Sequence, residues 1–549
     1  MPVICERIHF LLHNERATQW LACLAIVLVT AFAYHNSFSG PFIFDDLNAI
    51  PNNSTIRNLW PIWPVITPME GGGTVCGRPI LNLSFALNYA LGGLNVWGYH
   101  LGNLLIHISA ALAFFGFLRR TFLWEVLKGR FGRDSVALAL AITLLWSLHP
   151  IQTASVTYIV QRAESLAGLF YLLSLYLFVR GLEPNANRAW LWAAVGTCAV
   201  GMGCKETVVS LPVMALIYDR TFVAGTFQEG WRQRGRFYLA MFSTWILLAY
   251  FIVATNSRGG SAGLADELST IKYLQTQCCA IVEYLRLSFW PSPLIFDYGT
   301  PVILKPSEYL LPGVLVAIAL ITSLIAAWRK SVFGFFGVWF FAVLAPSSSF
   351  VAVVTQTMAC HRMYLPLVSV MALAVFAVYS RLGRIVFLFS AVAAGIFCWM
   401  TIQRYLDYRS EALIWSDTVK KCPTNPRALG NLGGIILRAN GYAEARLLLE
   451  ESVRINPRDA NTRSNLGIAL FQTGSKEQAI KEFRMVLELN PGKENGHLNL
   501  GMALVDLGKI NEAEVHLQEA LKQNPGDGMT LDALDAIRLK REALGRPQR

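Results

Sequence analysis

The sequence predicts an all-α protein in which a multi-pass helical membrane domain precedes an α-solenoid. Three observations predict this class. Hydrophobic residues make up 54% of the 549 residues and charged residues only 15%, with a mean hydropathy of +0.42, a composition typical of membrane proteins. The long apolar segments end near Arg404. Beyond that point, short sequence elements recur every 34 residues, as they do in stacked helical repeats.

Apolar segments of spanning or near-spanning length fill the first 403 residues, which we predict to be one polytopic domain with about eleven transmembrane helices. The segments are 18–36, 99–118, 135–149, 155–179, 189–203, 206–222, 237–255, 308–327, 332–346, 364–380 and 385–402. A further apolar stretch, 276–290, contains Glu283 and Arg286. We interpret it as an interfacial or re-entrant helix, and it would be a twelfth span if it crossed the bilayer. "RPILNLSFALNYALGG", from Arg78, is typical of a helix that lies along the membrane surface.

The charge distribution predicts a cytoplasmic N-terminus. With the N-terminus inside, the cytoplasmic segments carry 17 of the 26 basic residues in the first 403 positions, whereas the opposite loops carry nine basic and ten acidic residues. Positively charged loops stay on the cytoplasmic side. The outer loops 36–98 and 256–307, and everything after residue 403, are then periplasmic or luminal. The net charge is +11, and the basic residues that produce it lie in the loops between apolar segments. This placement indicates membrane topology and not nucleic-acid binding.

The C-terminal part, 404–549, contains an internal repeat. "NLG" recurs at Asn431, Asn465 and Asn499, and "NP" recurs at Asn456, Asn490 and Asn524, both with a period of 34 residues. This period, with small residues where two helices cross and a closing Pro, predicts a tetratricopeptide (TPR) fold. We predict a partial repeat at 408–425, full repeats at 427–460, 461–494 and 495–526, and a capping helix at 527–545. Such solenoids present a concave surface to a peptide or protein.

Adjacent carboxylates, Asp45 and Asp46, stand in "GPFIFDDLNAIPNN", directly after the first apolar segment. An acidic pair in a loop is most often simply solvated. At a membrane surface, however, partial desolvation makes a carboxylate more basic, so the pair is also a candidate general base or metal ligand.

Other ionisable residues fall on the same predicted face of the membrane. Each of them alone has an ordinary explanation as an ion pair, a turn residue or a snorkelling side chain. Together they form a largely cationic group that would suit a phosphate leaving group. They are Arg78, His149, Arg162, Glu164, Lys205, Glu206, His361 and Arg362.

These motifs resemble a known family. "FDDLNAIPNN", "GRPILNLSFALNYALGGLNVWGYHLGNLLIH", "HPIQTASVTYIVQRAESLAGLFYLLS", "CKETVVSLPVMALIYD" and the 34-residue repeats are similar to those of the transmembrane and tetratricopeptide-repeat protein O-mannosyltransferases, which belong to the GT-C glycosyltransferase superfamily. The sequence departs from the family at His361, where an acidic residue is usual, and between residues 256 and 306.

The resemblance implies inverting transfer of a sugar, usually mannose, from a polyprenyl- or dolichyl-phosphate donor to Ser or Thr hydroxyls of proteins outside the cytosol. In this interpretation Asp45 is the general base, and Asp46 orients it, binds sugar hydroxyls or holds a metal ion, whose requirement stays open. The donor phosphate and sugar would contact Arg78, His149, Arg162, Glu164, Lys205, Glu206 and Arg362. The TPR concave face, including Asn431, Asn465 and Asn499, would bind the acceptor polypeptide.

A scaffold and a transporter are the two alternative function classes. A non-catalytic TPR scaffold for an envelope or secretory complex would need one or two membrane anchors and would have no reason to gather ionisable residues on one face. A transporter would usually show symmetry between its halves and polar groups near the middle of the membrane. The sequence shows neither of those transporter features, so the enzyme is the preferred hypothesis.

Overall fold

A computed structural model of the chain describes residues 15–67, 73–255, 270–299, 302–303, 305–350, 356–493 and 495–544, and all regular structure in these ranges is helical. The chain forms two compact units. The first comprises residues 1–296 and 300–410, and the second comprises 297–299 and 411–549. The division falls after Ser410, later than the sequence-based boundary at 403, because helix α19 (Ile385–Tyr405) continues into a 3₁₀ turn, η9 (Leu406–Arg409), that packs against it.

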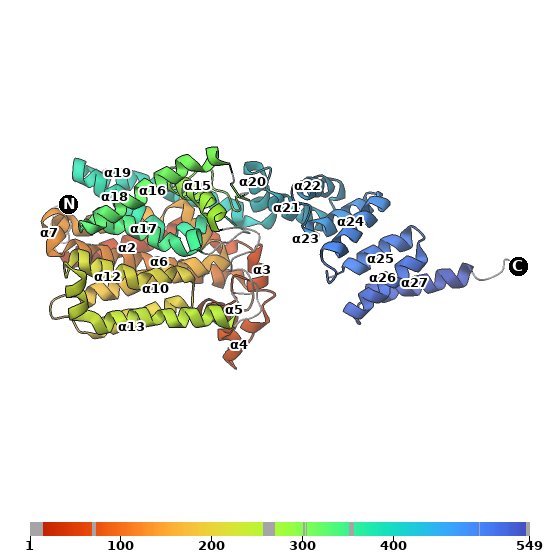
Figure 1. The fold of residues 1–549 in the computed structure, drawn as a ribbon, viewed down its shortest axis with the longest axis horizontal. Helices are drawn as coiled ribbons and strands as arrows, with labels where there is room; N and C mark the ends of the chain where they lie inside the picture. Colours follow the sequence, from red (N-terminus) through yellow and green to blue (C-terminus); the bar gives the residue numbers. More distant parts are fainter. Residues whose placement is uncertain are drawn as a thin grey trace, which may run out of the picture. The chain divides into compact units, whose positions relative to one another are not determined.

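Every apolar segment expected to span the membrane contains a helix, and the longest of these helices run side by side in the first unit (Figure 1). They are α2 (Glu15–Ala33), α6 (Val96–Phe122), α8 (Ser135–Ser147), α10 (Arg162–Gly181), α11 (Ala189–Met202), α12 (Leu211–Phe222), α13 (Phe227–Ala254), α16 (Pro306–Trp328), α17 (Val332–Ala345), α18 (Pro366–Leu382) and α19. Within the described residues, six helical segments are long and apolar enough to cross a membrane, or seven if the bent pair 125–147 and 150–156 is one span. The shorter apolar helices include α11 and α18, so the count of eleven spans stays a prediction.

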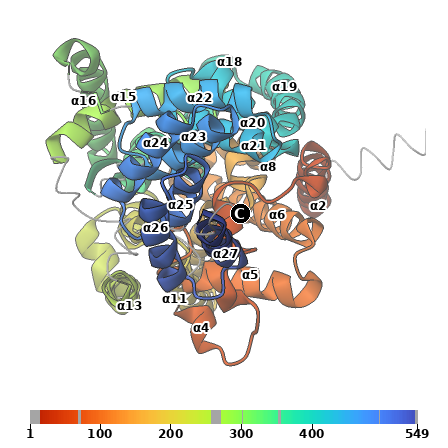
Figure 2. The same cartoon turned by 90° about the vertical axis from the view of Figure 1, so that its right-hand side faces the viewer.

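Burial separates the centre of this bundle from its edge. The apolar window of α10 is 78% buried, whereas that of α16 is only 6% buried. Figure 2 shows α16 at the margin of the bundle, and its exposed side chains include Leu311, Ile318 and Ile321. So large an apolar surface is stable only against a hydrophobic environment, which the acyl chains of a bilayer provide.

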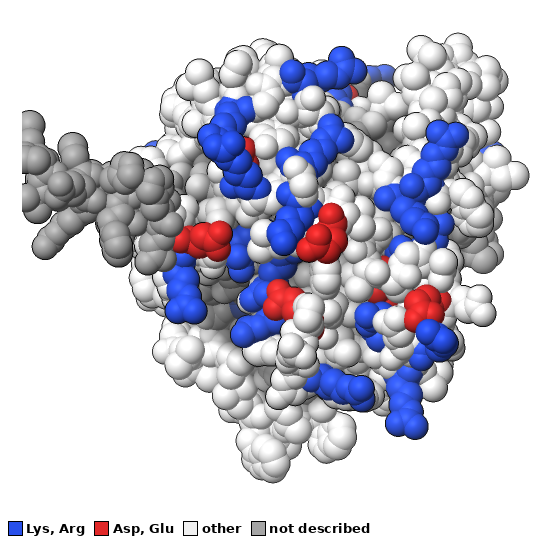
Figure 3. Space-filling view, turned by 90° about the vertical axis from the view of Figure 1, so that its left-hand side faces the viewer, with Lys and Arg blue, Asp and Glu red and all other residues white. Residues whose placement is uncertain are grey.

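The two ends of the first unit differ in charge. The short helices α3 (Asp45–Ala49) and α4 (Trp63–Ile66) and the predicted surface helix α5 (Pro79–Gly92) lie at one end, and α7 (Glu125–Phe131) lies at the other (Figure 1). Seen from the α7 end, Lys and Arg side chains outnumber Asp and Glu (Figure 3). This end carries the loops expected to be cytoplasmic. The acidic pair therefore lies at the end opposite the basic surface.

The second unit is a stack of antiparallel helix pairs, as the repeat predicts. It contains α20 (Glu411–Lys421), α21 (Pro426–Arg438), α22 (Tyr442–Ile455), α23 (Ala460–Gln472), α24 (Lys476–Leu489), α25 (Gly496–Asp506), α26 (Ile510–Gln523) and α27 (Gly528–Leu544). Small residues let the helices of a pair approach each other. A Cβ atom added to Gly467 of α23 would lie 2.5 Å from the Phe483 ring of α24, and one added to Gly501 of α25 would lie 2.7 Å from Leu517 of α26.

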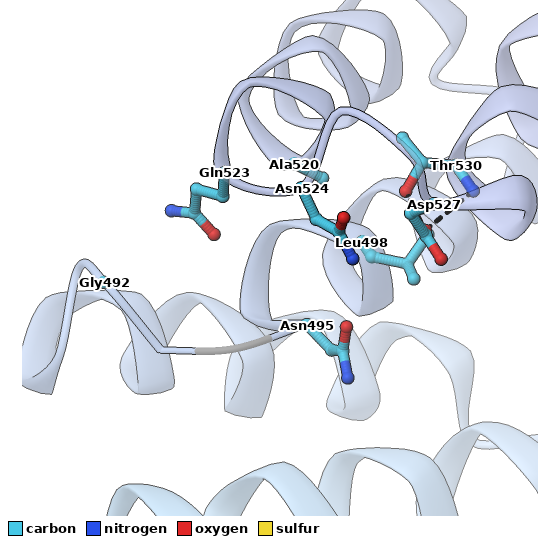
Figure 4. Close-up of a pocket in the computed structure, with 8 residues that line it drawn as sticks. All are labelled: Gly492, Asn495, Leu498, Ala520, Gln523, Asn524, Asp527 and Thr530. Carbon is cyan, nitrogen blue, oxygen red and sulfur yellow. Dashed lines mark hydrogen bonds between the residues drawn. The ribbon is translucent and has the colours of Figure 1, made fainter. Parts of the chain in front are cut away.

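A polar pocket of about 460 Å³ lies where the loop before α25 meets the loop before α27 (Figure 4). Asn495 adopts a left-handed backbone conformation with φ of 57°, which Asn tolerates better than most residues. The carboxylate of Asp527 accepts hydrogen bonds from the main-chain N–H and the hydroxyl of Thr530 and so caps α27. The polar groups of this pocket thus serve partly to shape the loops between repeats.

We predict that Gly467→Ala destabilises the TPR unit by about 1–3 kcal/mol, because the new methyl group overpacks the contact with Phe483. Gly528→Ala is the matched control: Gly528 begins α27 with nothing within 4 Å of its added Cβ, and the change should be neutral. Thermal unfolding of the purified protein compares the two. Equal melting temperatures for both variants would contradict the packing argument.

Candidate active site

The acidic pair begins a short helix behind a strained residue. Phe44, immediately before α3, has φ of 47° and ψ of −112°, a region that a residue with a bulky side chain rarely occupies. Such strain persists only where the surrounding structure enforces it, and it is common at functional sites. The Phe44 ring contacts Phe296, which also packs against Tyr158. These aromatic contacts fix the backbone just before Asp45.

Asp46 is completely buried and bound by main-chain N–H groups. One carboxylate oxygen accepts a hydrogen bond from the N–H of Val160 at 2.7 Å, and the other accepts one from the N–H of Ile43 at 3.0 Å. Burial raises the pKa of Asp46 to about 8, against the opposing effect of these N–H donors. With both oxygens committed, Asp46 holds the loop to the segment before α10 and is poorly placed to bind sugar or metal.

Asp45 is half-buried and therefore partly accessible. Its main-chain N–H donates a hydrogen bond to the hydroxyl of Tyr158 at 3.1 Å. The Tyr158 side chain is buried, and its hydroxyl is also hydrogen-bonded to the side chain of Asp45. A phenol is protonated at neutral pH, so Tyr158 donates to the carboxylate. Tyr158 could not be predicted from the sequence, because one Tyr in an apolar stretch has no distinctive pattern.

Arg162, a predicted phosphate ligand, is enclosed by protein acceptors. Its guanidinium donates to the side chain of Asn103 at 2.6 Å, to that of Asn88 at 2.6 Å and to the carbonyl of Tyr99 at 2.8 Å. It also bonds to Ser84 and is only 1% exposed. These partners belong to α5 and α6, so Arg162 joins the surface helix to the bundle. The geometry assigns it to positioning and leaves little of it for a phosphate.

His149 is likewise used within the protein. Its Nδ1 accepts a hydrogen bond from the main-chain N–H of Ile151, and its Nε2 lies 3.1 Å from the carbonyl of Ser288 on α15 (Thr270–Phe289). A ring that accepts at Nδ1 and donates at Nε2 is neutral. His149 therefore connects the end of α8 to α15, and its predicted contact with the donor is not favoured by this arrangement.

Two ion pairs form beside the first turn of α10. The Lys205 ammonium lies 2.6 Å from a Glu164 oxygen, and both side chains are buried. Arg78 pairs with Glu206 at 3.3 Å and also donates to the carbonyl of Thr74. Burial lowers the pKa of Lys205, with Glu164 acting in the opposite direction. The predicted residues Arg78, Glu164, Lys205 and Glu206 are thus brought together.

His361 and Arg362 join this cationic group through the short helix η8 (Cys360–Met363). Burial, followed by the positive charges of Lys205, Arg362 and Arg78, lowers the pKa of His361 well below its ordinary value, so the imidazole is neutral. The Arg362 guanidinium donates to the carbonyls of Gln356, Thr357 and Ser347. The group therefore has a net positive charge next to the uncharged imidazole of His361. Its three cations are Arg78, Lys205 and Arg362, and its two carboxylates are Glu164 and Glu206.

An apolar cavity of about 350 Å³ opens between α15, α16, α17 and α18. Ser369 and Val370 line it from the first turns of α18, the helix that begins directly after η8. The hydroxyl of Ser369 is buried and has no hydrogen-bond partner within the described structure. The cavity is otherwise lined by Leu285, Phe289, Ala319, Ser323, Gly337, Phe340, Phe341, Leu373 and Ala374.

Metal binding receives no support from these contacts. Among the residues that the structure describes, no three His, Cys, Asp or Glu side chains are grouped closely enough to hold a metal ion. The divalent-metal role considered for Asp46 therefore has no further ligands in this part of the chain. The outer loop 256–307 lies partly outside the described residues, at 256–269, 300–301 and 304.

Comparison with known proteins agrees with this architecture: a multi-pass helical membrane protein with a TPR domain. Tetratricopeptide-repeat family models match residues 418–494 and 498–522. The chain is 28% identical to protein O-mannosyl-transferase TMTC3 of Mus musculus over 339 residues, which are 57% of this chain and 34% of that protein. It is 33% identical to protein O-mannosyl-transferase TMTC2 of Homo sapiens over 204 residues, 34% of this chain and 22% of that protein.

The resemblance to the TMTC-type protein O-mannosyl-transferases is thus confirmed, with the chain matching about a third or less of the length of these relatives. Among solved structures, ArnT from Cupriavidus metallidurans is 14% identical with a TM-score of 0.41, over 86% of this chain and 80% of that chain.

The raised pKa of Asp46 predicts a stability that falls with pH. Between its ordinary pKa of 3.8 and its folded value of about 8, the folded state binds more protons than the unfolded state, so stability decreases as pH rises through this window and levels off above it. From pH 6 to pH 8 this contribution amounts to about 2–3 kcal/mol at most.

Asp46→Asn removes the ionisable group and should remove this component of the pH dependence. It should also cost about 1–3 kcal/mol at low pH, because one main-chain N–H then faces an amide NH₂. Thermal unfolding of wild type and variant at pH 6, 7, 8 and 9 tests both effects. Parallel curves for the two proteins would show that Asp46 does not titrate in this range.

Proposed function

We propose that the protein is a membrane glycosyltransferase that transfers a sugar, with mannose the expected one, from a polyprenyl- or dolichyl-phosphate donor to Ser or Thr hydroxyls of polypeptides. One observation carries the proposal. The backbone from Val160 to Glu164 connects two groups. On one side, its hydrogen bond to Asp46 holds the neighbouring Asp45, whose carboxylate is partly accessible. On the other side, Glu164 pairs with Lys205, which belongs to the net-positive group. A reaction that deprotonates a hydroxyl and expels a phosphate needs both.

In the proposed reaction, Asp45 accepts the proton of the acceptor hydroxyl as its oxygen attacks the anomeric carbon of the donor. The bond from that carbon to the phosphate oxygen breaks on the opposite face, and the polyprenyl phosphate leaves with the electron pair. One base is sufficient, and the configuration inverts. Lys205, Arg78 and Arg362 supply positive charge toward the departing phosphate.

The donor's isoprenoid chain is assigned to the apolar cavity between α15 and α18. This assignment is supported by the order of two elements: η8, which carries Arg362, is followed directly by α18, which lines the cavity. A donor with an anionic head and an apolar tail would contact Arg362 with its phosphate and the cavity with its tail. The position of the acidic pair, opposite the basic end of the first unit (Figure 3), supports a site on the non-cytoplasmic side, with the N-terminus cytoplasmic and the TPR unit periplasmic or luminal. Residues 1–14 lie outside the described structure.

We expect Asp45→Asn to lower sugar transfer by about 10²–10⁴-fold, the contribution of a general base, without altering the melting temperature. The measurement is transfer from a radiolabelled polyprenyl-phosphate mannose to a Ser/Thr-containing acceptor by the purified protein. Asp532→Asn, at an exposed position of α27, is the matched control. Full activity in Asp45→Asn would rule out this residue as the base. Absence of transfer by wild type from every lipid-linked sugar tested would favour a scaffold.

Tyr158→Phe should lower kcat about 5–100-fold, because it removes one hydrogen bond of about 1–3 kcal/mol at Asp45 and keeps the ring contact with Phe296. If Tyr158 positions Asp45, the pH at which kcat/KM reaches half its maximum should also shift. KM for the donor should hardly change. A lower melting temperature with an unchanged kcat would assign Tyr158 a purely structural role.

A further inference from the structure

Residues 296–299, which we call the strap, lie in the loop between α15 and α16. The chain leaves the first unit after Phe296, contributes Asp297–Gly299 to the second unit and then returns to the first. All other residues of the second unit follow Ser410. The strap is therefore a second covalent connection between the helical bundle and the TPR unit, far earlier in the sequence than the connection at Ser410.

Asp297 attaches the strap to the first full repeat. Its carboxylate forms an ion pair with Arg427 at 2.8 Å, and its main-chain carbonyl accepts a hydrogen bond from the Asn425 side chain at 2.9 Å. Asp297 is buried, whereas the Arg427 side chain is partly exposed. A buried carboxylate that loses its cation is left uncompensated, which is costly. The ion pair therefore holds Asp297 firmly in the second unit.

Gly299 lets the strap lie directly against Asn425. Its φ of 51° lies in the left-handed region, and a Cβ atom added to it would lie 2.3 Å from the Asn425 side chain. The same asparagine caps α21, because its side-chain oxygen accepts hydrogen bonds from the N–H groups of Arg427 and Ala428. The other carboxylate oxygen of Asp297 accepts a hydrogen bond from the N–H of Gly299. The strap is thus fixed to the start of α21 at several points.

Phe296, the residue before Asp297, contacts two residues that support Asp45. Its ring packs edge-on against that of Phe44, the strained residue before Asp45, with the ring centroids 6.3 Å apart. It also packs edge-on against the ring of Tyr158 at 5.1 Å, and the Tyr158 hydroxyl bonds to Asp45. One ring therefore supports both of the groups that fix Asp45.

A single peptide bond joins these two sets of contacts. The Cα atoms of adjacent residues are held about 3.8 Å apart, so a shift of Asp297 moves Phe296 as well. Phe44 has a backbone conformation that persists only while its surroundings enforce it. Release of Asp297 from Arg427 would let Phe296 withdraw from Phe44, and the backbone before the acidic pair would relax.

We propose that Asp297 is a positioning residue for Asp45, and that its pairing with Arg427 is the contact through which the TPR unit acts. The TPR unit keeps the Phe296 ring in place behind the acidic pair, and so contributes to catalysis besides any docking of the acceptor. The assignment of Asp45 as the base rests on the proposed function. The two contributions differ kinetically, because lost docking raises KM for the acceptor, whereas a displaced base lowers kcat.

Hydrogen exchange followed by mass spectrometry tests the connection without donor or acceptor, on the full-length protein in detergent. In Asp297→Asn and in Arg427→Gln, peptides covering 297–299 and those covering 43–47 should both exchange about threefold faster or more, because local opening becomes easier. The double variant should exchange no faster than either single variant, since each change breaks the same pair.

Arg438→Gln is the matched control for the exchange experiment. Arg438 also lies on α21 and pairs with a carboxylate of the second unit, that of Glu411, so the variant should leave both segments as in wild type. Unchanged exchange of 43–47 in Asp297→Asn and Arg427→Gln would overturn the proposal. Equally fast exchange of 43–47 in Arg438→Gln would overturn it too, because the effect would not be specific to the strap.

Phe296→Leu tests whether the ring transmits the effect. It should accelerate exchange of 43–47 and leave 297–299 protected, because the Asp297 contacts are kept. Phe389→Leu, the same change at an exposed position of α19, should alter neither segment. Exchange of 43–47 in Phe296→Leu that equals that of wild type would contradict the role of the ring.

Kinetics then separate positioning from docking. In Arg427→Gln, kcat for transfer from polyprenyl-phosphate mannose should fall about 5–100-fold, the effect of a misplaced reacting group, with KM for the acceptor nearly unchanged. Arg427→Lys keeps the charge and should recover most of the loss. A raised acceptor KM with an unchanged kcat would assign Arg427 to docking and overturn the proposal. Exchange that depends on the strap, in a protein that transfers no sugar, would support the strap while contradicting the proposed activity.

Discussion

The hydrogen bonds between the buried carboxylate of Asp46 and main-chain N–H groups are the constraint on which the rest of the site depends. They attach the loop that follows α2 to the segment that starts at Val160 and leads into α10. The same short segment supplies Arg162, which holds α5 and α6, and Glu164, which holds Lys205. Because five consecutive residues anchor all of these contacts, the acidic pair and the cationic group have a defined separation.

Burial decides how accessible each of the ionisable residues is. A charge inside a helical bundle is costly unless it is paired, and the protein provides partners for Arg162 through carbonyl and amide oxygens and for Lys205 through Glu164. Burial raises the pKa of Asp46 to about 8, and its two oxygens accept hydrogen bonds from peptide N–H groups. Asp45 differs because its side chain is only half-buried. The two neighbouring aspartates therefore have different surroundings. Asp46 holds the loop in place through main-chain N–H groups, and the side chain of Asp45 is partly accessible.

The helices and the repeats could be predicted because local patterns encode them. Runs of apolar residues predicted the helices α2, α6, α8, α10 to α13 and α16 to α19, and the 34-residue period predicted α21 to α26. The site could be predicted only in part. "DD" and the scattered cations were visible as unusual residues in an apolar chain, but Tyr158 and Asn103 were not, because a single Tyr or Asn in an apolar stretch has many ordinary reasons to be there. Their contribution depends on partners that are distant in the sequence, such as Asp45 for Tyr158.

The sequence by itself determined that the protein is a helical membrane protein with a TPR domain, and it predicted that the candidate site residues lie on one face of the membrane, since hydropathy, charge asymmetry and a fixed repeat are properties of the chain alone. Only the tertiary structure decided the surroundings of each ionisable group. It committed both oxygens of Asp46, enclosed Arg162 and His149, and left Asp45 accessible. The physical reason is that the reactivity of a charged side chain depends on its solvation and its hydrogen-bond partners, and packing brings those partners from distant parts of the chain.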